Sequence, residues 1–395
     1  MSVDESVSLL GPSSRGSQGG LPAPGNAVRD TLSDMSVTFE ISPNPSPRTD
    51  AEVAELVKDP GFGRYFTDHM AQIAWTKGQG WHSAKIVPYG PIALDPSAAV
   101  LHYGQEIFEG MKAYRHEDDS VWLFRPERNA RRFQTSAARL MLPELPTDLF
   151  VDAARELVSI DARYVPPAAG EHSLYLRPFM IASEAFLGVR AAEEVTFYVI
   201  ASPVGPYFAQ GVTGVDIWVT DRWARAGIGG TGAAKCGGNY AASLIAQYEG
   251  YEHGCNQVMF IEASEKDRVE ELGGMNVFLV GANGELVTPA LTGTILDGIT
   301  RDSILTVGES LGLKPEQRRL SASEVFSGIA DGTFVEAFCC GTAAVISPIS
   351  GFVTDKGEYR PQGQGFATTL QIRNAVLDVQ YGRTPDEYGW LQRVV

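Results

Sequence analysis

Lys235 lies in a glycine-rich stretch whose composition is typical of a reactive side chain held close to a ligand. The stretch reads Gly227-Ile228-Gly229-Gly230-Thr231-Gly232-Ala233-Ala234-Lys235-Cys236-Gly237-Gly238-Asn239-Tyr240 and precedes a predicted helix. Glycine allows the backbone to approach a ligand closely, and a lysine held away from water has a lowered pKa and can attack an aldehyde. Lys235 is therefore the candidate nucleophile.

The residues alone leave two other interpretations of this stretch open. It could be a flexible surface loop, or its amide groups could cradle a phosphate while Lys235 supplies only charge. The spacing GxxxxGK[ST] of nucleotide-binding P-loops is not met, because Ala234 precedes the lysine and Cys236 follows it. A nucleotide-binding loop is therefore disfavoured.

The elements that must position Lys235 alternate between strands and helices. Apolar spacing predicts strands at 121–124, 196–200, 215–220, 257–261 and 276–280, and helices at 149–160, 239–250, 301–312 and 321–330. We expect Thr147 or Asp148 to cap the first of these helices, and Ser321 with Glu324 to form a capping box on the last.

The order of these elements predicts an α+β fold of two mixed domains with a cleft between them. The stretch from Ser202 to Tyr207 breaks regular structure and marks the boundary. We expect a disordered leader over 1–36, rich in Ser, Gly and Pro, followed by a small domain over 37–201, a linker over 202–211 and a larger domain over 212–395, which contains Lys235.

Composition excludes several classes of function. The net charge of -16 over 395 residues disfavours nucleic acid as a partner, and no apolar run is long enough to span a membrane. The four cysteines lack CxxC spacing and the six histidines lack paired ligand spacing, so we expect neither a disulfide framework nor a metal site. A reducing, cytoplasmic location fits this pattern.

Several motifs, in order along the chain, resemble the fold-type IV pyridoxal-phosphate enzymes, and specifically the branched-chain amino-acid aminotransferases. The similarity runs from about Phe62 to the C-terminus. The matching segments are 66–70 (FTDHM), 101–103 (LHY), 108–113 (FEGMKA), 175–178 (YLRP), 235–240 (KCGGNY), 271–276 (ELGGMN), 298–301 (GITR) and 341–343 (GTA).

The resemblance implies pyridoxal 5′-phosphate as the cofactor and gives individual residues roles toward it. Lys235 would carry it as a Schiff base and later move the substrate's proton, Glu271 would pair with the pyridine nitrogen, and Tyr240 would bind the phenolic oxygen. The phosphate would be bound by Arg132, by amides of Ile299 and Thr300 where a helix is predicted to begin, and by the Thr342 hydroxyl. Only the motif selects Arg132 among several neighbouring arginines.

The resemblance also implies the substrate contacts. Arg177, flanked by Tyr103 and Tyr175, would bind the distal carboxylate of glutamate, while Phe62, Phe108 and Tyr207 would form the apolar wall and amides of Ala343 and Ala344 would bind the α-carboxylate. Leu187 and Val189 match a loop that reaches the neighbouring subunit's pocket, which implies a homodimer.

The reaction implied is transamination of L-leucine, L-isoleucine and L-valine with 2-oxoglutarate. A D-amino-acid aminotransferase or aminodeoxychorismate lyase would keep the fold and cofactor, and a non-catalytic phosphate-ligand binding protein is the alternative from another class. The chain departs from the animal enzymes of the family in two features: Gly274 replaces a threonine, and Ala344 and Ser347 replace a CxxC redox pair.

Overall fold

The computed structural model describes residues 38–168, 170–206, 212–363 and 365–395, and residues Thr38–Val395 form one compact unit. The leader expected over 1–36 and the proposed wall residue Tyr207 lie outside the described residues.

The first half of the chain builds a nine-stranded, largely antiparallel sheet with the order β1-β3-β2-β8-β7-β5-β6-β18, and β4 pairs with β7. Its strands are β1 Glu40–Ile41, β2 His69–Thr76, β3 Gly80–Pro88, β4 Glu106–Phe108, β5 Met111–Arg115, β6 Val121–Phe124, β7 Ser173–Ala182, β8 Glu194–Val204 and β18 Leu391–Arg393. The helices that accompany it are α1 Asp50–Leu56, α2 Ala99–Tyr103, α3 Pro126–Arg139 and α4 Thr147–Ile160, with a short 3-10 turn at Ala162–Tyr164.

The second half builds another nine-stranded sheet, with the order β11-β10-β9-β16-β15-β12-β13-β14 and with β17 paired to β16. Its strands are β9 Val215–Thr220, β10 Gln257–Ile261, β11 Val269–Leu272, β12 Asn276–Gly281, β13 Glu285–Pro289, β14 Lys314–Arg318, β15 Phe334–Gly341, β16 Val345–Thr354 and β17 Gly357–Tyr359. Its helices are α5 Gly237–Glu252, α6 Ile299–Ser310, α7 Ala322–Asp331 and α8 Ala367–Gln380.

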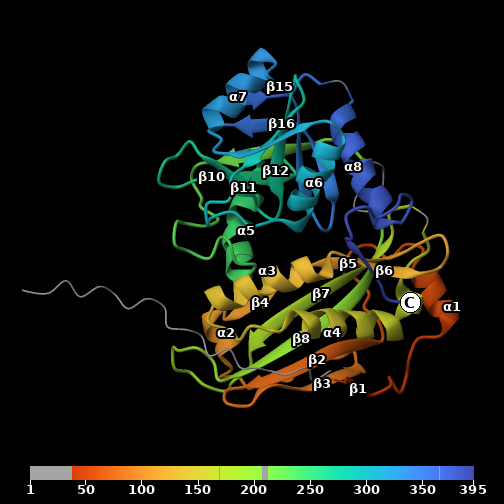
Figure 1. The fold of residues 1–395 in the computed structure, drawn as a ribbon. Helices are drawn as coiled ribbons and strands as arrows, with labels where there is room; N and C mark the ends of the chain where they lie inside the picture. The colour runs from red at the N-terminus through yellow and green to blue at the C-terminus, as the bar shows by residue number, and fades with distance from the viewer. Residues whose placement is uncertain (1–37, 169, 207–211, 364) are drawn as a thin grey trace, which may run out of the picture. The chain divides into compact units, whose positions relative to one another are not determined.

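Each sheet has a core closed by aromatic side chains. Phe133 of α3, Phe150 of α4 and Phe197 of β8 pack together with ring centroids 5.3–5.7 Å apart, and all three are buried. In the second sheet the rings of Phe278 and Phe338 stack across β12 and β15 at 5.0 Å. Figure 1 shows α3 and α4 beside the first sheet and α5 to α8 around the second. The expected α+β fold with two mixed sheets is confirmed.

The C-terminus joins the two halves. Strand β18 pairs with β6 of the first sheet, with Leu391 opposite Phe124, although α8 immediately before it packs on the second sheet. The last residues of the chain therefore return to the sheet formed by the first half.

Most of the predicted elements are found, and several have the expected bounds. Strands β9 and β10 span 215–220 and 257–261 as predicted, and α5, α6 and α7 lie within two residues of the expected helices. The expected break at Ser202 is wrong, because β8 continues to Val204. The ladder with β2 ends at Val199, and among the described residues only the Thr67 N–H, which donates to the Ala201 carbonyl, continues it, so Pro203 lies where a missing N–H is tolerated.

The capping predictions hold only in part. Neither Thr147 nor Asp148 caps α4, because the helix already begins at Thr147 and its N-cap is Pro146, which has no side-chain acceptor. Ser321 does cap α7 by accepting the Glu324 N–H at 3.0 Å. The Glu324 carboxylate binds Arg318 instead of returning to the cap, so the second half of the capping box is replaced by an ion pair.

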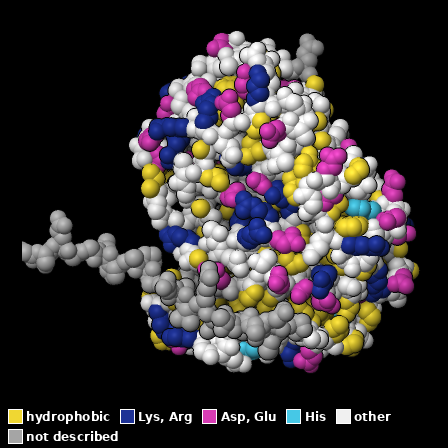
Figure 2. Space-filling model, in the orientation of Figure 1, with side chains coloured by type: hydrophobic (Ala, Val, Ile, Leu, Met, Phe, Trp, Pro, Cys, Tyr) yellow, Lys and Arg dark blue, Asp and Glu magenta, His cyan; other side chains and the backbone are white. Residues whose placement is uncertain are grey.

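The surface carries charges of both signs. Figure 2 shows Lys and Arg gathered near the middle of one face with Asp and Glu directly beside them. Among the described residues, no helix is both long enough and apolar enough to cross a membrane.

Candidate active site

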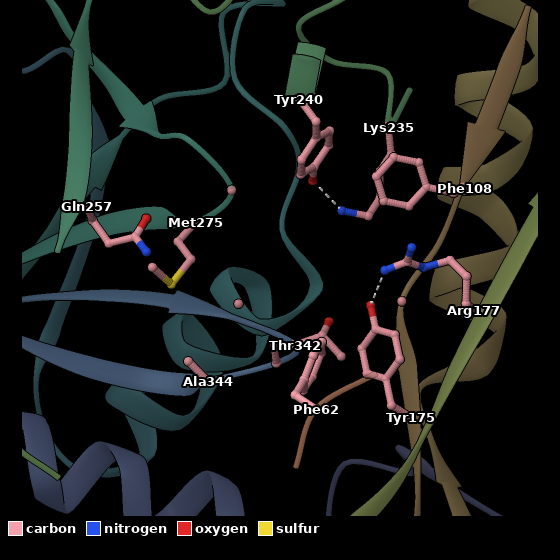
Figure 3. A pocket seen from close by; sticks show the side chains of 14 residues that line it. Phe62, Phe108, Tyr175, Arg177, Lys235, Tyr240, Gln257, Met275, Thr342 and Ala344 are labelled. Atoms are coloured by element: carbon pink, nitrogen blue, oxygen red, sulfur yellow. Dashed lines mark hydrogen bonds between the residues drawn. The ribbon is translucent and has the colours of Figure 1, made fainter. Parts of the chain in front are cut away.

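A cavity of 260 Å³ lies between the two sheets and brings together most of the residues that the sequence singled out. Figure 3 shows Phe108, Tyr175 and Arg177 on the wall formed by the first sheet, with Gln257 and Met275 facing them from the second. The predicted residues that line the cavity are Phe62, Phe108, Tyr175, Arg177, Lys235, Tyr240, Thr342, Ala343 and Ala344. Gly110, Gln257, Gly274, Met275 and Gly341 complete the lining.

The backbone of Lys235 is held from both sides by elements of the first sheet's half. Its N–H donates to the buried hydroxyl of Ser136 on α3 at 2.9 Å, and its carbonyl accepts the N–H of Phe108 at 3.0 Å. Its Nζ donates to the hydroxyl of Tyr240 at 2.6 Å, a contact drawn in Figure 3. The side chain is therefore aimed into the cavity by contacts on three sides.

The glycine-rich stretch before Lys235 is a fixed structure, so the interpretation as a flexible surface loop does not hold. Arg139 donates to the carbonyls of Gly229 and Gly230, and the Asn239 amide donates to those of Thr231 and Ala234. A side chain at Gly232 would drive its Cβ into the Thr294 carbonyl oxygen, which explains the need for glycine there.

Glu271 is a buried carboxylate at the end of β11 with three donors around it. Its Oε1 accepts the Leu296 N–H at 2.9 Å and lies 2.6 Å from the Arg225 guanidinium, while its Oε2 accepts from the Asn276 amide at 3.0 Å. Burial raises the pKa of Glu271 to about 7, with Arg225 and the Leu296 N–H acting against that rise. An additional cation beside the carboxylate would favour its ionised form.

Arg177 presents a cation among aromatic rings. Its guanidinium donates to the Tyr175 hydroxyl at 3.0 Å and lies 4.8 Å from the centre of the Phe108 ring. Its Nε is buried and has no hydrogen-bond partner among the described residues. A buried donor without a partner is costly, so this guanidinium is suited to an anionic ligand.

The beginning of α6 contributes to a second, smaller cavity, which shares Gly110 and Thr342 with the first and is also lined by Asn129, Ile299 and Thr300. The first hydrogen bond at the start of α6 joins the Asp302 N–H to the Gly298 carbonyl. The N–H groups of Ile299 and Thr300 precede it, and the positive end of the helix dipole lies there. The expectation that a helix begins at this point is confirmed.

Arg132 lies behind this helix start and does not line the large cavity. Its Nε and Nη2 each donate to the Glu109 carboxylate at 2.7 Å, and its Nη1 donates to the Asp297 carbonyl at 3.0 Å. Both charged groups are buried. Glu109, which the sequence did not single out, therefore fixes the orientation of Arg132 beside the first turn of α6.

The turn Thr342–Ala344 connects β15 and β16 and is held by a lysine that the sequence did not single out. The Nζ of Lys112 on β5 donates to the Ala343 carbonyl at 2.9 Å, and burial lowers the pKa of Lys112 to about 8. Val345, which follows the turn, has a left-handed backbone with φ of 59°, an outlier for a β-branched residue. The turn is thus constrained at its central residue and directly after its last one.

Tyr103, Leu187 and Val189 lie away from this cavity. The Tyr103 hydroxyl donates to the Leu187 carbonyl, and Leu187 and Val189 are 59% and 84% exposed. Tyr103 and Val189 line a different cavity of 470 Å³ together with Cys236 and Gly238. The structure therefore separates Tyr103 from Arg177, beside which the resemblance had placed it.

Comparison with known proteins gives the family. The model of the amino-transferase class IV family matches residues 106–352, which include Lys235, Glu271 and Thr342. The chain belongs to this family. A probable branched-chain-amino-acid aminotransferase of Streptomyces coelicolor is 52% identical over 356 residues, covering 90% of this chain and 98% of that protein. The branched-chain-amino-acid aminotransferase of Mycolicibacterium smegmatis is 49% identical over 360 residues, with the same two coverages. Within class IV, the chain is therefore a member of the branched-chain amino-acid aminotransferases.

Solved structures agree with this assignment. The T.th. branched-chain amino acid aminotransferase with pyridoxamine 5′-phosphate matches with a TM-score of 0.67 and 28% identity, covering 82% of this chain and 99% of that one. The same enzyme complexed with N-(5′-phosphopyridoxyl)-L-glutamate matches with a TM-score of 0.66, at the same identity and coverage. Both are complexes with a phosphorylated pyridine compound.

Three charged residues of the site escaped the sequence analysis. Glu109 and Lys112 lie in the motif at 108–113, where charged residues beside Phe108 and Met111 were a signal for buried partners. Arg225 lies ten residues before Lys235, and no pattern distinguished it from a surface arginine. Each is defined by a partner that is distant in sequence or on another element.

We predict that Glu109→Gln lowers the free energy of unfolding by about 3–5 kcal/mol, because it leaves the buried guanidinium of Arg132 without its counter-ion. Chemical denaturation measures this change. Glu127→Gln, the same substitution at an exposed position of α3, is the control and should change stability by less than about 0.5 kcal/mol. Equal stability of the two variants would contradict the structural importance of the pair.

Proposed function

We propose that this protein transfers the amino group of L-leucine, L-isoleucine and L-valine to 2-oxoglutarate, with pyridoxal 5′-phosphate held on Lys235. The observation that carries the proposal is the geometry of Lys235, whose Nζ meets the Tyr240 hydroxyl inside a cavity that also contains the guanidinium of Arg177. The similarity to enzymes of this name, at up to 52% identity, supports the choice of substrates.

The chain's own donors and acceptors fit this cofactor. Lys235 supplies an amine for the aldehyde, and the start of α6 supplies amides of Ile299 and Thr300 for a phosphate, with the Thr342 hydroxyl beside them. Glu271 is a buried acceptor suited to a protonated pyridine nitrogen. Arg132 would act at the phosphate through Asp297 and the first turn of α6, since Glu109 occupies two of its three nitrogens.

When bound, the cofactor supplies an electron sink that stabilises negative charge at the substrate Cα. Lys235 would remove the proton from that carbon and deliver it to C4′ of the cofactor, and in the second half-reaction it would carry a proton in the opposite direction, from C4′ to the Cα of the new amino acid. Tyr240 orients the lysine nitrogen through its 2.6 Å contact, and Ser136 and Phe108 keep the lysine backbone in place. The nitrogen that would carry the proton is therefore held in position by contacts to both the backbone and the side chain of Lys235.

One cavity must accept both an apolar side chain and the carboxylate of glutamate. Phe62, Phe108 and Tyr175 provide apolar surface that favours branched side chains by excluding water. Arg177 lies among these rings with an unpartnered Nε, and it would bind the distal carboxylate in the other half-reaction. The ring faces stabilise the guanidinium while no anion is bound.

The α-carboxylate, which both substrates share, would meet the amides of Ala343 and Ala344. Small side chains at these positions let a ligand approach the backbone, and the turn that carries them lines the cavity. Lys112 holds the carbonyl of Ala343 from behind, so that the N–H groups of the turn keep one orientation. Its positive charge also favours an anion at the turn.

We further infer a homodimer in which Leu187 and Val189 reach the neighbouring subunit's pocket. Both are exposed apolar side chains, and Val189 lines the 470 Å³ cavity together with Cys236 and Gly238. Because the Tyr103 hydroxyl binds the Leu187 carbonyl, Tyr103 would act together with this loop. The outer face of α5 adds four further apolar side chains with exposed fractions of 51–66%, namely Leu244, Ile245, Tyr248 and Tyr251.

For the activity itself, we predict that the holoprotein transaminates L-leucine with 2-oxoglutarate and that Lys235→Ala lowers kcat by roughly three or more orders of magnitude, as expected when a nucleophile is removed. Lys356→Ala, an exposed lysine, should retain full activity. A preference for D-alanine over L-leucine would instead assign the chain to the D-amino-acid aminotransferases, and near-normal turnover by Lys235→Ala would refute the role of Lys235.

For substrate selection, we predict that Arg177→Met lowers kcat/KM for 2-oxoglutarate by about 10- to 150-fold, because it removes a charge-assisted hydrogen bond of about 1.5–3 kcal/mol. The value for L-leucine should change by less than about threefold, since an apolar side chain makes no use of that charge. Separate half-reactions with each substrate measure the two values. An equal loss for both would mean that Arg177 maintains the cavity without selecting the acid.

A further inference from the structure

Five buried charges of alternating sign lie in the second half of the chain and end at Glu271. In order of their electrostatic contacts they are Glu262, Arg268, Glu270, Arg225 and Glu271. None of the five side chains is more than 11% exposed. Burying this many charges is costly unless each one is needed to balance its neighbours.

Arg225 is the central member of this row. Its Nη2 lies 2.6 Å from the Glu271 carboxylate and also donates to the carbonyls of Gly232 and Thr294. Its Nε is buried without a hydrogen-bond partner among the described residues. The contact with Gly232 joins Arg225 to the stretch that carries Lys235. One guanidinium therefore contacts both Glu271 and the glycine-rich stretch.

Glu270 is the second carboxyl group that faces Arg225. It is 1% exposed, its Oε1 has no hydrogen-bond partner among the described residues, and it interacts with the Thr294 hydroxyl and with the charges of Arg225 and Arg268. Burial raises the pKa of Glu270, and these three neighbours act against the rise. Because side chains alternate along a strand, Glu270 cannot line the side of β11 on which Glu271 lies.

The charged and titratable groups around Glu271 come from several elements. Arg225 and Lys235 lie on the segments before α5, Glu270 is its neighbour on β11, and Arg301 of α6 and the Cys340 thiol of β15 are within electrostatic range. The Nη2 of Arg301 donates to the Pro289 carbonyl and to the amide oxygen of Gln317, whereas its buried Nε has no hydrogen-bond partner among the described residues. Burial holds the pKa of the Cys340 thiol well above its usual value, so the thiol is neutral.

We propose that Arg225 and Glu270 are positioning residues for Glu271. Arg225 keeps the buried Glu271 ionised and oriented, and Glu270 balances part of the positive charge of Arg225, so that Glu271 still presents a net negative field to the pyridine nitrogen. This inference rests on the proposed function, because it concerns the protonation of the pyridine ring of the cofactor that Lys235 would hold.

The physical reason lies in the number of charges. If Arg225 faced Glu271 alone, the pair would be neutral, and the guanidinium behind the carboxylate would offset part of the attraction between Glu271 and a protonated pyridine nitrogen. With two carboxylates sharing one guanidinium, the group keeps a net negative charge that favours the proton on the nitrogen. Glu270 achieves this without entering the cavity.

The test is the protonation of the pyridine nitrogen in protein reconstituted with 15N-labelled pyridoxal phosphate. Solid-state 15N NMR, from pH 6 to the highest pH at which the protein stays folded, reports that protonation without any turnover. We expect Glu270→Gln to lower the pKa of the nitrogen by about one unit, a tenfold weaker hold on the proton. Glu270→Asp should restore the parent value, and Thr294→Val should shift it in the same direction as Glu270→Gln by a smaller amount.

The matched control is Glu336→Gln, which removes a buried carboxylate whose partners are the backbone amides and hydroxyl at the start of α8. It should leave the nitrogen unchanged. Identical 15N titrations for the parent, Glu270→Gln and Thr294→Val would overturn the inference while leaving the proposed function intact. Failure of the parent itself to bind the labelled cofactor on Lys235 would refute the proposed function instead.

Discussion

The position of the Lys235 backbone is the constraint on which the rest of the site depends. The residue belongs to the half of the chain that forms the second sheet, yet its N–H and carbonyl are bound by Ser136 and Phe108 from the first. A reactive amine on a glycine-rich stretch would otherwise sample many positions, at a cost to any reaction that needs a fixed distance. Lys235 is therefore held by hydrogen bonds to both halves of the chain, to Ser136 and Phe108 of the first and to Tyr240 of the second.

The buried charges of the site are also held by contacts between segments that are distant in the sequence. Glu109 binds Arg132 beside the first turn of α6, and Arg225 binds Glu271 at the end of β11. Such pairs contribute little net stability compared with apolar substitutes, but the loss of one partner is expensive. Their value here is orientation: one pair fixes the helix start that would bind phosphate, and the other fixes the carboxylate that would bind the pyridine nitrogen. Arg177 differs, since among the described residues it donates to a tyrosine hydroxyl and forms no ion pair with a carboxylate, although it interacts electrostatically with Glu106.

Much of the architecture was accessible from the sequence because apolar periodicity is a local signal. Strands β9 and β10 were predicted with their observed bounds, and the start of α6 was recognised from Gly298 and Thr300. The end of β8 was not predicted correctly. A proline is accepted at position 203 because the ladder between β8 and β2 ends at Val199, and this strand pairing cannot be seen in the local sequence. Motif similarity found the residues that line the cavity but not Arg225, whose role depends on a carboxylate 46 residues later in the chain.

The central claim is that Lys235 carries pyridoxal phosphate in a cavity that accepts L-leucine. The most direct test is borohydride reduction of the purified protein after an absorption spectrum with and without L-leucine, followed by peptide mapping. We predict a visible absorption band that L-leucine removes, and a reduced adduct located on Lys235 that forms only when reduction precedes the addition of leucine. A protein that stays colourless and unmodified after pyridoxal phosphate is supplied, or an adduct on another lysine, would contradict the claim.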